Sequence, residues 1–154
     1  AYEMQRSLVG SEMCIRDTDW SGDTGVGGQY FSQDAVIRLA PAAGIPLPEM
    51  LTPAEKLSAV QELAAAGDPR ALAIFRDIGV YLGHTLPLYA GVYELKNLMV
   101  LGRVASGIGG ELIVSECRRV LAEEYPALRV SVTLPDEQFR RVGQSVAAAS
   151  LPEV

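Results

Sequence analysis

The residues best suited to contact a ligand lie in a glycine-rich run at positions 101–110, LGRVASGIGG. Four of these ten residues are glycines, which let a backbone bend sharply and approach a bound molecule closely. The run follows a stretch typical of a strand and precedes one typical of a helix, whose free N–H groups favour an anionic or hydrogen-bonding group. The pattern predicts a ligand-binding turn, although a turn that only packs a helix against a strand fits the same residues.

The sequence predicts no metal site and no catalytic residue. Cys14 and Cys117 lie far apart, and the single histidine, His84, has no cysteine near it, so the short spacings of zinc and haem sites are absent. We interpret His84 as a packing or surface residue. No residue is assigned to general-base catalysis.

Two predicted strands and a helix between them position the glycine-rich run. Residues 97–101, NLMVL, form a short apolar run, which predicts a strand buried on both faces. After the turn at 102–110, a helix stops before Pro126 and has an inner face made of Ile113, Cys117, Val120 and Leu121. Residues 129–134 alternate and are rich in β-branched side chains, so they predict a second strand. Because a helix lies between them, the strands should be parallel with a right-handed connection.

Three helices are predicted upstream of the strands. Ser32 is the N-cap of the first, which Gly44 ends. The segment Thr52-Pro53-Ala54-Glu55 has the pattern of a capping box with proline at the first helical position, and Gly67 ends that second helix. Asp68-Pro69 repeats the cap and proline and opens a longer helix, which should form a hairpin with the second.

The long helix has two further sequence features, a pair of glycines one turn apart and a long uncharged stretch. Gly79 and Gly83 lie one turn apart, and each costs about 1 kcal/mol relative to alanine, so another backbone should approach closely there. The uncharged stretch at 78–93 is shorter than a membrane-spanning helix requires and predicts a buried core helix. A last helix is expected to begin at Pro135-Asp136, carrying Phe139, Val142 and Val146 on one side.

The glycine-rich run and the end of the chain carry a resemblance to a known family. Residues 100–107, VLGRVASG, resemble the adenosine motif of sugar kinases of the hexokinase and ROK type, in the actin-like ATPase (ASKHA) superfamily. Residues 140–152, RRVGQSVAAASLP, resemble the terminal helix of the same proteins. The similarity covers most of the chain after Asp68 and, more loosely, the region from Trp20.

The resemblance implies an α/β fold: a partial actin-like ATPase (ribonuclease H-like) C-terminal lobe, with a short parallel strand pair and several packed helices. In that family the glycine turn contacts adenine and ribose. The implied cofactor is ATP, with magnesium in the parent protein, and Arg103 either lies over the adenine or reaches a phosphate. The predicted cofactor-binding residues are Gly102, Arg103, Val104, Ser106, Gly107, Gly109 and Gly110.

The chain also departs from the family pattern. Residues 1–17 resemble a translated sequencing adapter, so we expect residues 18–154 to be an incomplete nucleotide-side lobe, inactive alone. The expected parent is an ATP-dependent sugar kinase; the alternative is a non-catalytic, sugar-responsive transcriptional regulator or sensor of the same fold. A Rossmann-type module fits less well because no strand leads into Gly-x-Gly-x-x-Gly. A phosphate loop at residues 23–28, DTGVGG, lacks convincing strands on either side.

Composition limits the partners. The formal net charge of −6 argues against nucleic acid, since few Lys and Arg are available to contact phosphates. We expect a nucleotide and, in the parent protein, a sugar as ligands, no membrane partner, and a cytoplasmic, reduced protein. A homodimer of the parent is compatible with these properties.

Overall fold

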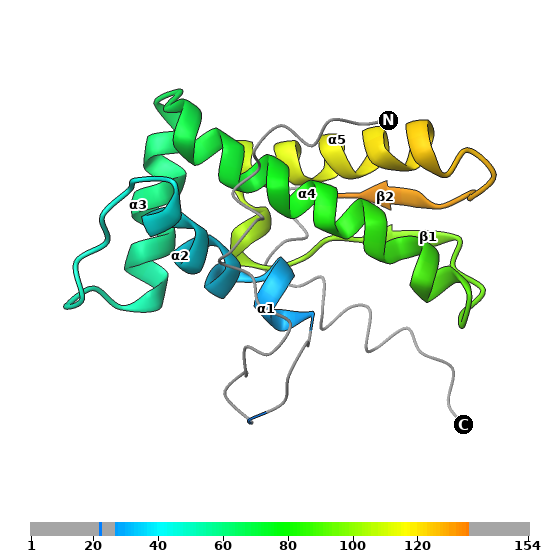
Figure 1. Ribbon diagram of the computed structural model, residues 1–154, viewed down its shortest axis with the longest axis horizontal. Helices are drawn as coiled ribbons and strands as arrows, with labels where there is room; N and C mark the ends of the chain where they lie inside the picture. The colour runs from blue at the N-terminus through cyan, green and yellow to red at the C-terminus, as the bar shows by residue number, and fades with distance from the viewer. Residues whose placement is uncertain (1–21, 23–26, 136–154) are drawn as a thin grey trace.

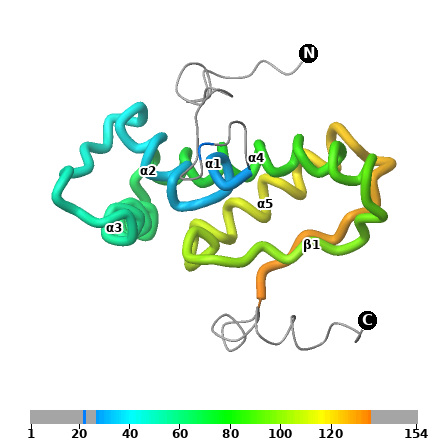
Figure 2. The backbone as a smooth tube through the Cα atoms, turned by 90° about the horizontal axis from the view of Figure 1, so that it is seen from below, coloured from blue at the N-terminus to red at the C-terminus, as the bar shows by residue number. Residues whose placement is uncertain are grey.

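In a computed structural model, which describes residue 22 and residues 27–135, the chain is α/β and mostly helical, with a short parallel two-stranded sheet (Figure 1). Helix α4 (Pro69–Ala90) packs against helix α5 (Gly107–Glu124). Strands β1 (Asn97–Met99) and β2 (Ser131–Thr133) lie beside α5, so that α5 is sandwiched between α4 and the strands (Figure 2). The remaining helices are α1 (Gly28–Phe31), α2 (Gln33–Ala42) and α3 (Pro53–Ala65).

The parallel strand pair confirms the predicted connection through a helix. Asn97 is paired with Ser131 and Met99 with Thr133. Both strands are shorter than the sequence pattern predicted, since β1 ends before Val100 and β2 begins at Ser131. Parallel strands end at the same edge of a sheet, so the segments that follow β1 and β2 lie close together.

The helices begin and end at the predicted signals. Ser32 caps α2 by accepting a hydrogen bond from the Asp34 N–H at 3.1 Å. The capping box of α3 is complete, because Thr52 Oγ1 accepts from the Glu55 N–H and the Glu55 carboxylate accepts from the Thr52 N–H. Gly44 and Gly67, which follow α2 and α3, have positive φ angles of 73° and 84°. These conformations explain why glycine stands at both helix ends.

Asp68, the N-cap of α4, predicts acid sensitivity. Hydrogen bonds from the Arg70 side chain lower the pKa of Asp68 to about 2 from its ordinary value of 3.8. Because the folded-state pKa is the lower one, this interaction stabilises the fold above about pH 4 and is lost as the pH falls toward about 2. Asparagine also caps helices but carries no charge. We therefore expect Asp68→Asn to destabilise the chain near neutral pH and the difference to shrink between about pH 4 and pH 2.

Urea unfolding of both chains at several pH values measures this difference. A gap between the two free energies of unfolding that stays constant down to about pH 2 would contradict the assignment.

The two glycines inside α4 are explained by close contact with α5, as predicted. A Cβ atom built on Gly79 would lie 2.5 Å from the Ile113 carbonyl oxygen, and one on Gly83 would lie 2.7 Å from Val120 Cβ. The side chains packed around this contact are fully or almost fully buried: Ile74, Phe75, Ile78, Ile113, Cys117 and Val120. The α4–α5 contact therefore forms the centre of the core and holds the start of α5 in place.

The prediction that the first strand is buried on both faces is wrong. Met99 is 55% exposed, and Asn97 is exposed as well. The reason is the layer order: α5 covers one face of the strand pair, and no described element packs against the other face. An apolar run shows that a segment can be buried, but the number of covering layers decides whether it is.

The prediction of a buried core helix over residues 78–93 is correct for its first half only. Ile78, Leu82 and Leu86 are buried, but α4 ends at Ala90, and Leu88, Val92 and Tyr93 are between 67% and 77% exposed. α4 extends beyond the part of α5 that covers it. No described helix has the length and apolarity needed to cross a membrane. The segment 1–17, Cys14, Trp20, residues 23–26 and the expected helix after Pro135 lie outside the described residues.

Candidate functional site

The predicted turn connects β1 to α5, as the sequence indicated, but it is shorter than predicted. Val100 still donates a hydrogen bond to the Thr133 carbonyl at 2.9 Å, and residues Arg103–Ala105 form a single 3₁₀ turn. α5 begins at Gly107, so residues 107–110 are the first turn of the helix and not part of a loop. The bend itself comprises residues 100–106.

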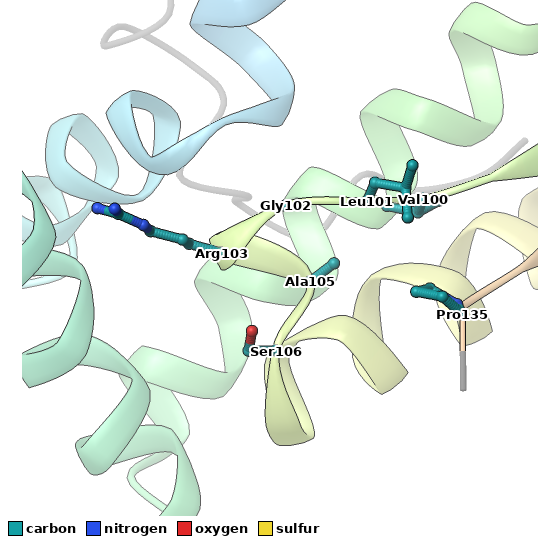
Figure 3. Close-up of a pocket in the computed structure, with 7 residues that line it drawn as sticks. All are labelled: Val100, Leu101, Gly102, Arg103, Ala105, Ser106 and Pro135. Atoms are coloured by element: carbon teal, nitrogen blue, oxygen red, sulfur yellow. The ribbon is translucent and has the colours of Figure 1, made fainter. Parts of the chain in front are cut away.

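The outer surface of the bend is free of side-chain cover at two glycines. Gly102 has a φ of 108° and Gly107 a φ of 60°, conformations that residues with a side chain rarely adopt. Apart from the adjoining residues of the chain, no residue in the described part has an atom within 4 Å of a Cβ built on either glycine. We call the adjacent depression of about 210 Å³ the turn hollow; it is lined by Val100, Leu101, Gly102, Arg103, Ala105, Ser106 and Pro135 (Figure 3).

The turn hollow lies where ligands commonly bind in α/β proteins. Val100 follows the last residue of β1, and Pro135 lies two residues beyond the end of β2, so the hollow is at the carboxyl edge of the parallel pair. Such edges are the usual ligand positions of open α/β sheets. Ser106, the N-cap of α5, makes no side-chain capping bond, which leaves the first N–H groups of this long helix without a side-chain acceptor from their cap. The helix dipole favours a negative or hydrogen-bonding ligand group there.

The seven predicted binding residues divide into an outer and an inner set. Gly102, Arg103 and Gly107 are exposed, and Ser106 is partly exposed. Val104, Gly109 and Gly110 are buried beneath the turn. A Cβ on Gly109 would lie 2.7 Å from the Phe75 ring, and one on Gly110 would lie 2.1 Å from the Ala105 carbonyl oxygen. Packing therefore explains why these two positions are glycines, in place of the ligand contact inferred from the sequence.

Arg103 lies between two depressions. A second one, of about 350 Å³, adjoins the turn hollow and is lined by Gly102 and Arg103 together with residues 31–34 at the start of α2. In Figure 3 the Arg103 side chain extends away from Val100 and Pro135. Its guanidinium group can therefore reach a ligand that extends out of the turn hollow on the side of α2.

Gln61 supports the turn and was missed by the sequence reasoning. Its Nε2 group, on α3, donates a hydrogen bond to the Arg103 carbonyl oxygen at 2.9 Å. The Ser106 N–H donates to the same oxygen at 3.2 Å. Gln61 and Arg103 are 42 positions apart, and a glutamine on a helix surface gives no local sign of such a contact. The 3₁₀ turn is thus held by α3 as well as by α5.

His84 and Cys117, the other side chains that could react, contact parts of the fold away from the turn. His84 lies at the surface, where Nδ1 is 3.1 Å from the Tyr125 hydroxyl and Nε2 is 3.8 Å from a Glu124 oxygen. Cys117 is buried in the α4–α5 contact, and burial raises the pKa of its thiol to about 11, so the reactive thiolate is disfavoured. Among the described residues, no three His, Cys, Asp or Glu side chains come together in a way that could hold a metal ion.

Comparison with protein-family models, curated proteins and solved structures found no match to this chain. The local geometry of the turn and the pattern of its residues are therefore the features that bear on function.

Proposed function

We propose that the bend between β1 and α5 binds the adenosine part of ATP, and that the chain is the nucleotide-side lobe of an ATP-dependent sugar kinase of the ROK type, with an actin-like fold. The observation that carries the proposal is the bare outer surface of the bend. Gly102 and Gly107 both adopt positive φ angles, and apart from their own chain neighbours no described residue has an atom within 4 Å of a Cβ built on either. This surface lies at the carboxyl edge of a parallel strand pair, within the segment that resembles an adenosine motif.

The size of the turn hollow fits part of a nucleotide. Typical pockets for whole small-molecule ligands are about 300–1,000 Å³, and the turn hollow measures about 210 Å³. In our proposal the base and ribose lie in the turn hollow against Gly102 and reach the exposed Gly107, which follows the lining residue Ser106, while the phosphates extend past Arg103. The Arg103 guanidinium group then stacks on the base or bonds to a phosphate.

We assign the phosphoryl-transfer step to none of the described residues. Enzymes that transfer a phosphoryl group position the acceptor hydroxyl and stabilise the charge on the phosphates, largely with a metal ion. No group of three or more His, Cys, Asp or Glu side chains among the described residues could hold a metal ion, and we assign none of these residues to the magnesium ion that the resemblance implies. Their role in the proposal is limited to holding and orienting the nucleoside.

Calorimetric titration with ATP, AMP, adenosine and inorganic triphosphate tests the proposal. An open site of this size should bind weakly, with a dissociation constant of about 1 mM, or about 4 kcal/mol of binding free energy. We expect adenosine and AMP to bind, ATP to bind at least as tightly as adenosine, and triphosphate not to compete with adenosine. If triphosphate binds as well as ATP while adenosine does not bind, the bend is an anion site and the adenosine assignment is wrong.

Gln61 provides a graded test of the same site. Gln61→Met keeps the length of the side chain but cannot donate to the Arg103 carbonyl oxygen. A hydrogen bond of this kind contributes about 1 kcal/mol, so we expect ATP affinity to fall about fivefold while the chain stays folded. Gln33→Met is the matched control with adenosine as the ligand, because Gln33 lines only the second depression, which adenosine does not enter, and it should bind adenosine as the unchanged chain does. Equal affinity in Gln61→Met would show that α3 does not position the turn.

A further inference from the structure

The opposite end of the sheet carries a larger depression of about 470 Å³. Lys96 and Ser131 line it, and these residues stand at the points where β1 and β2 begin. The last turns of α5 and the loop that follows contribute Leu121 and Leu128. We call this site the basic hollow. It shares no lining residue with the turn hollow, so a ligand in one leaves the other free.

Three cationic side chains line the basic hollow: Lys96, Arg118 and Arg129. They stand out because the whole chain has a formal net charge of −6. No aspartate or glutamate is among the described residues that line this hollow. A local excess of one sign of charge attracts ligands of the opposite sign even when the net charge of the protein opposes them.

Each of the three cations can contribute to binding an anion. Arg118 donates to the Val132 carbonyl oxygen through Nε and Nη2, which fixes its guanidinium plane and leaves its other N–H groups for a ligand. Lys96 pairs with Glu94 at 2.7 Å, but both side chains are more than 70% exposed, and such surface pairs contribute little. Arg129 makes no ion pair or side-chain hydrogen bond with another described residue.

The partial negative charge at the C-terminal end of α5 also attracts cations, but this attraction does not explain the positions of Lys96 and Arg129. Lys96 and Arg129 lie on segments outside α5, and neither side chain donates a hydrogen bond to a described carbonyl of that helix. The Leu121 carbonyl in the last turn already accepts from the Tyr125 N–H at 3.0 Å. The helix end therefore does not use these two cations directly.

Apart from Ser131, the rest of the lining is apolar. Leu121 is buried, and Leu128 and Val130 are partly buried at the wall of the hollow. An inorganic anion would leave this wall in contact with water, and an uncharged apolar molecule would leave the cations without a counter-charge. The lining suits a molecule that has both parts, since apolar contact and charge-assisted hydrogen bonds then add.

We propose that the basic hollow binds a small organic anion, a carboxylate or phosphate monoester, whose apolar body lies against Leu121, Leu128 and Val130. Its charged group faces the three cations. The negative net charge of the chain opposes approach to an anionic membrane surface, which favours a free small molecule over a lipid headgroup. This inference stands on its own residues and does not rest on the proposed adenosine site.

Calorimetric titration of the chain with 2-naphthoate tests the inference. We expect saturable binding, at least about tenfold tighter than for acetate, which lacks the apolar body, and for 2-naphthylmethanol, which lacks the charge. Arg129→Gln and Lys96→Gln should each weaken 2-naphthoate binding about tenfold, because each removes a charge-assisted contact. Arg76→Gln is the matched control: it removes one exposed positive charge on α4, outside the basic hollow, and should leave the affinity unchanged.

Three results would overturn the inference. The first is the absence of saturable 2-naphthoate binding, and the second is equal binding of the neutral alcohol. The third is unchanged affinity in both Arg129→Gln and Lys96→Gln, whether or not these variants are less stable, because the cations would then serve the fold alone. Binding of 2-naphthoate that persists in Gly107→Asn, a change at the start of α5 next to Ser106 of the turn hollow, would show that the two sites are separate, as we expect.

Discussion

Gly79→Ala is expected to lower the free energy of unfolding by about 2 kcal/mol, although alanine favours a helix interior over glycine by about 1 kcal/mol. The added Cβ would lie 2.5 Å from the Ile113 carbonyl oxygen and 2.9 Å from Glu116 Cβ. The nearest obstacle is backbone, which cannot rotate away, so α4 and α5 must move apart. Overpacking of this kind costs about 1–3 kcal/mol, which outweighs the gain in helix propensity.

A second glycine provides the control for this effect. Gly28, in α1, meets no atom within 4 Å of an added Cβ, so Gly28→Ala should be neutral or slightly stabilising. Urea unfolding of both variants gives the comparison. If Gly79→Ala proves as stable as Gly28→Ala, the close approach of α4 and α5 is wrong, and with it the position of the α5 N-terminus.

Gly107→Asn should remove nucleotide binding while leaving the fold almost unchanged. Asparagine tolerates a positive φ better than other residues with a side chain, and no protein atom lies within 4 Å of its Cβ position. The side chain then occupies the space in which we place the nucleoside. We expect ATP affinity to fall at least about tenfold and the free energy of unfolding to change by less than about 1 kcal/mol.

Gly67→Asn is the matched control for this substitution. Gly67 also has a positive φ, 84°, and open space at its Cβ, but it lies in the connection between α3 and α4. It should show a similar change in stability and normal ATP binding. Equal ATP affinity in both variants would remove the surface of the bend from the site.

Local signals in the sequence predicted the parts of the fold that local chemistry determines. The capping box at Thr52 marks the start of α3 because the Thr52 and Glu55 side chains accept hydrogen bonds from backbone N–H groups at the helix start. Gly44 and Gly67 mark the ends of two helices because their backbones adopt positive φ angles. The pair Gly79 and Gly83 predicted a close helix contact, since only such a contact compensates two glycines inside a helix.

The sequence could not predict which surfaces are covered. Met99 and Val92 have the same apolar character as buried residues, and their exposure follows from the number and length of the neighbouring elements. The contact between Gln61 and Arg103 joins residues far apart in the chain, which no local pattern records.

In the candidate site, too, the sequence predicted the local turn but not which of its residues are covered. The glycines of residues 101–110 are one residue type in one short run, and the sequence interpretation treated them alike. In the structure, Gly102 and Gly107 are exposed with positive φ angles, whereas Gly109 and Gly110 are buried against Phe75 and Ala105. Only the backbone angles and neighbours distinguish a glycine that leaves room for a ligand from one that leaves room for packing.

The most direct test of the adenosine assignment is an NMR titration of the chain with adenosine. We predict saturable shifts of the Gly102, Arg103 and Gly107 amide signals, no shift at Gly67, and nuclear Overhauser contacts from adenine protons to the α-protons of Gly102 or Gly107. Adenosine that leaves these three signals unmoved, or that contacts only residues elsewhere in the chain, would contradict the proposed site.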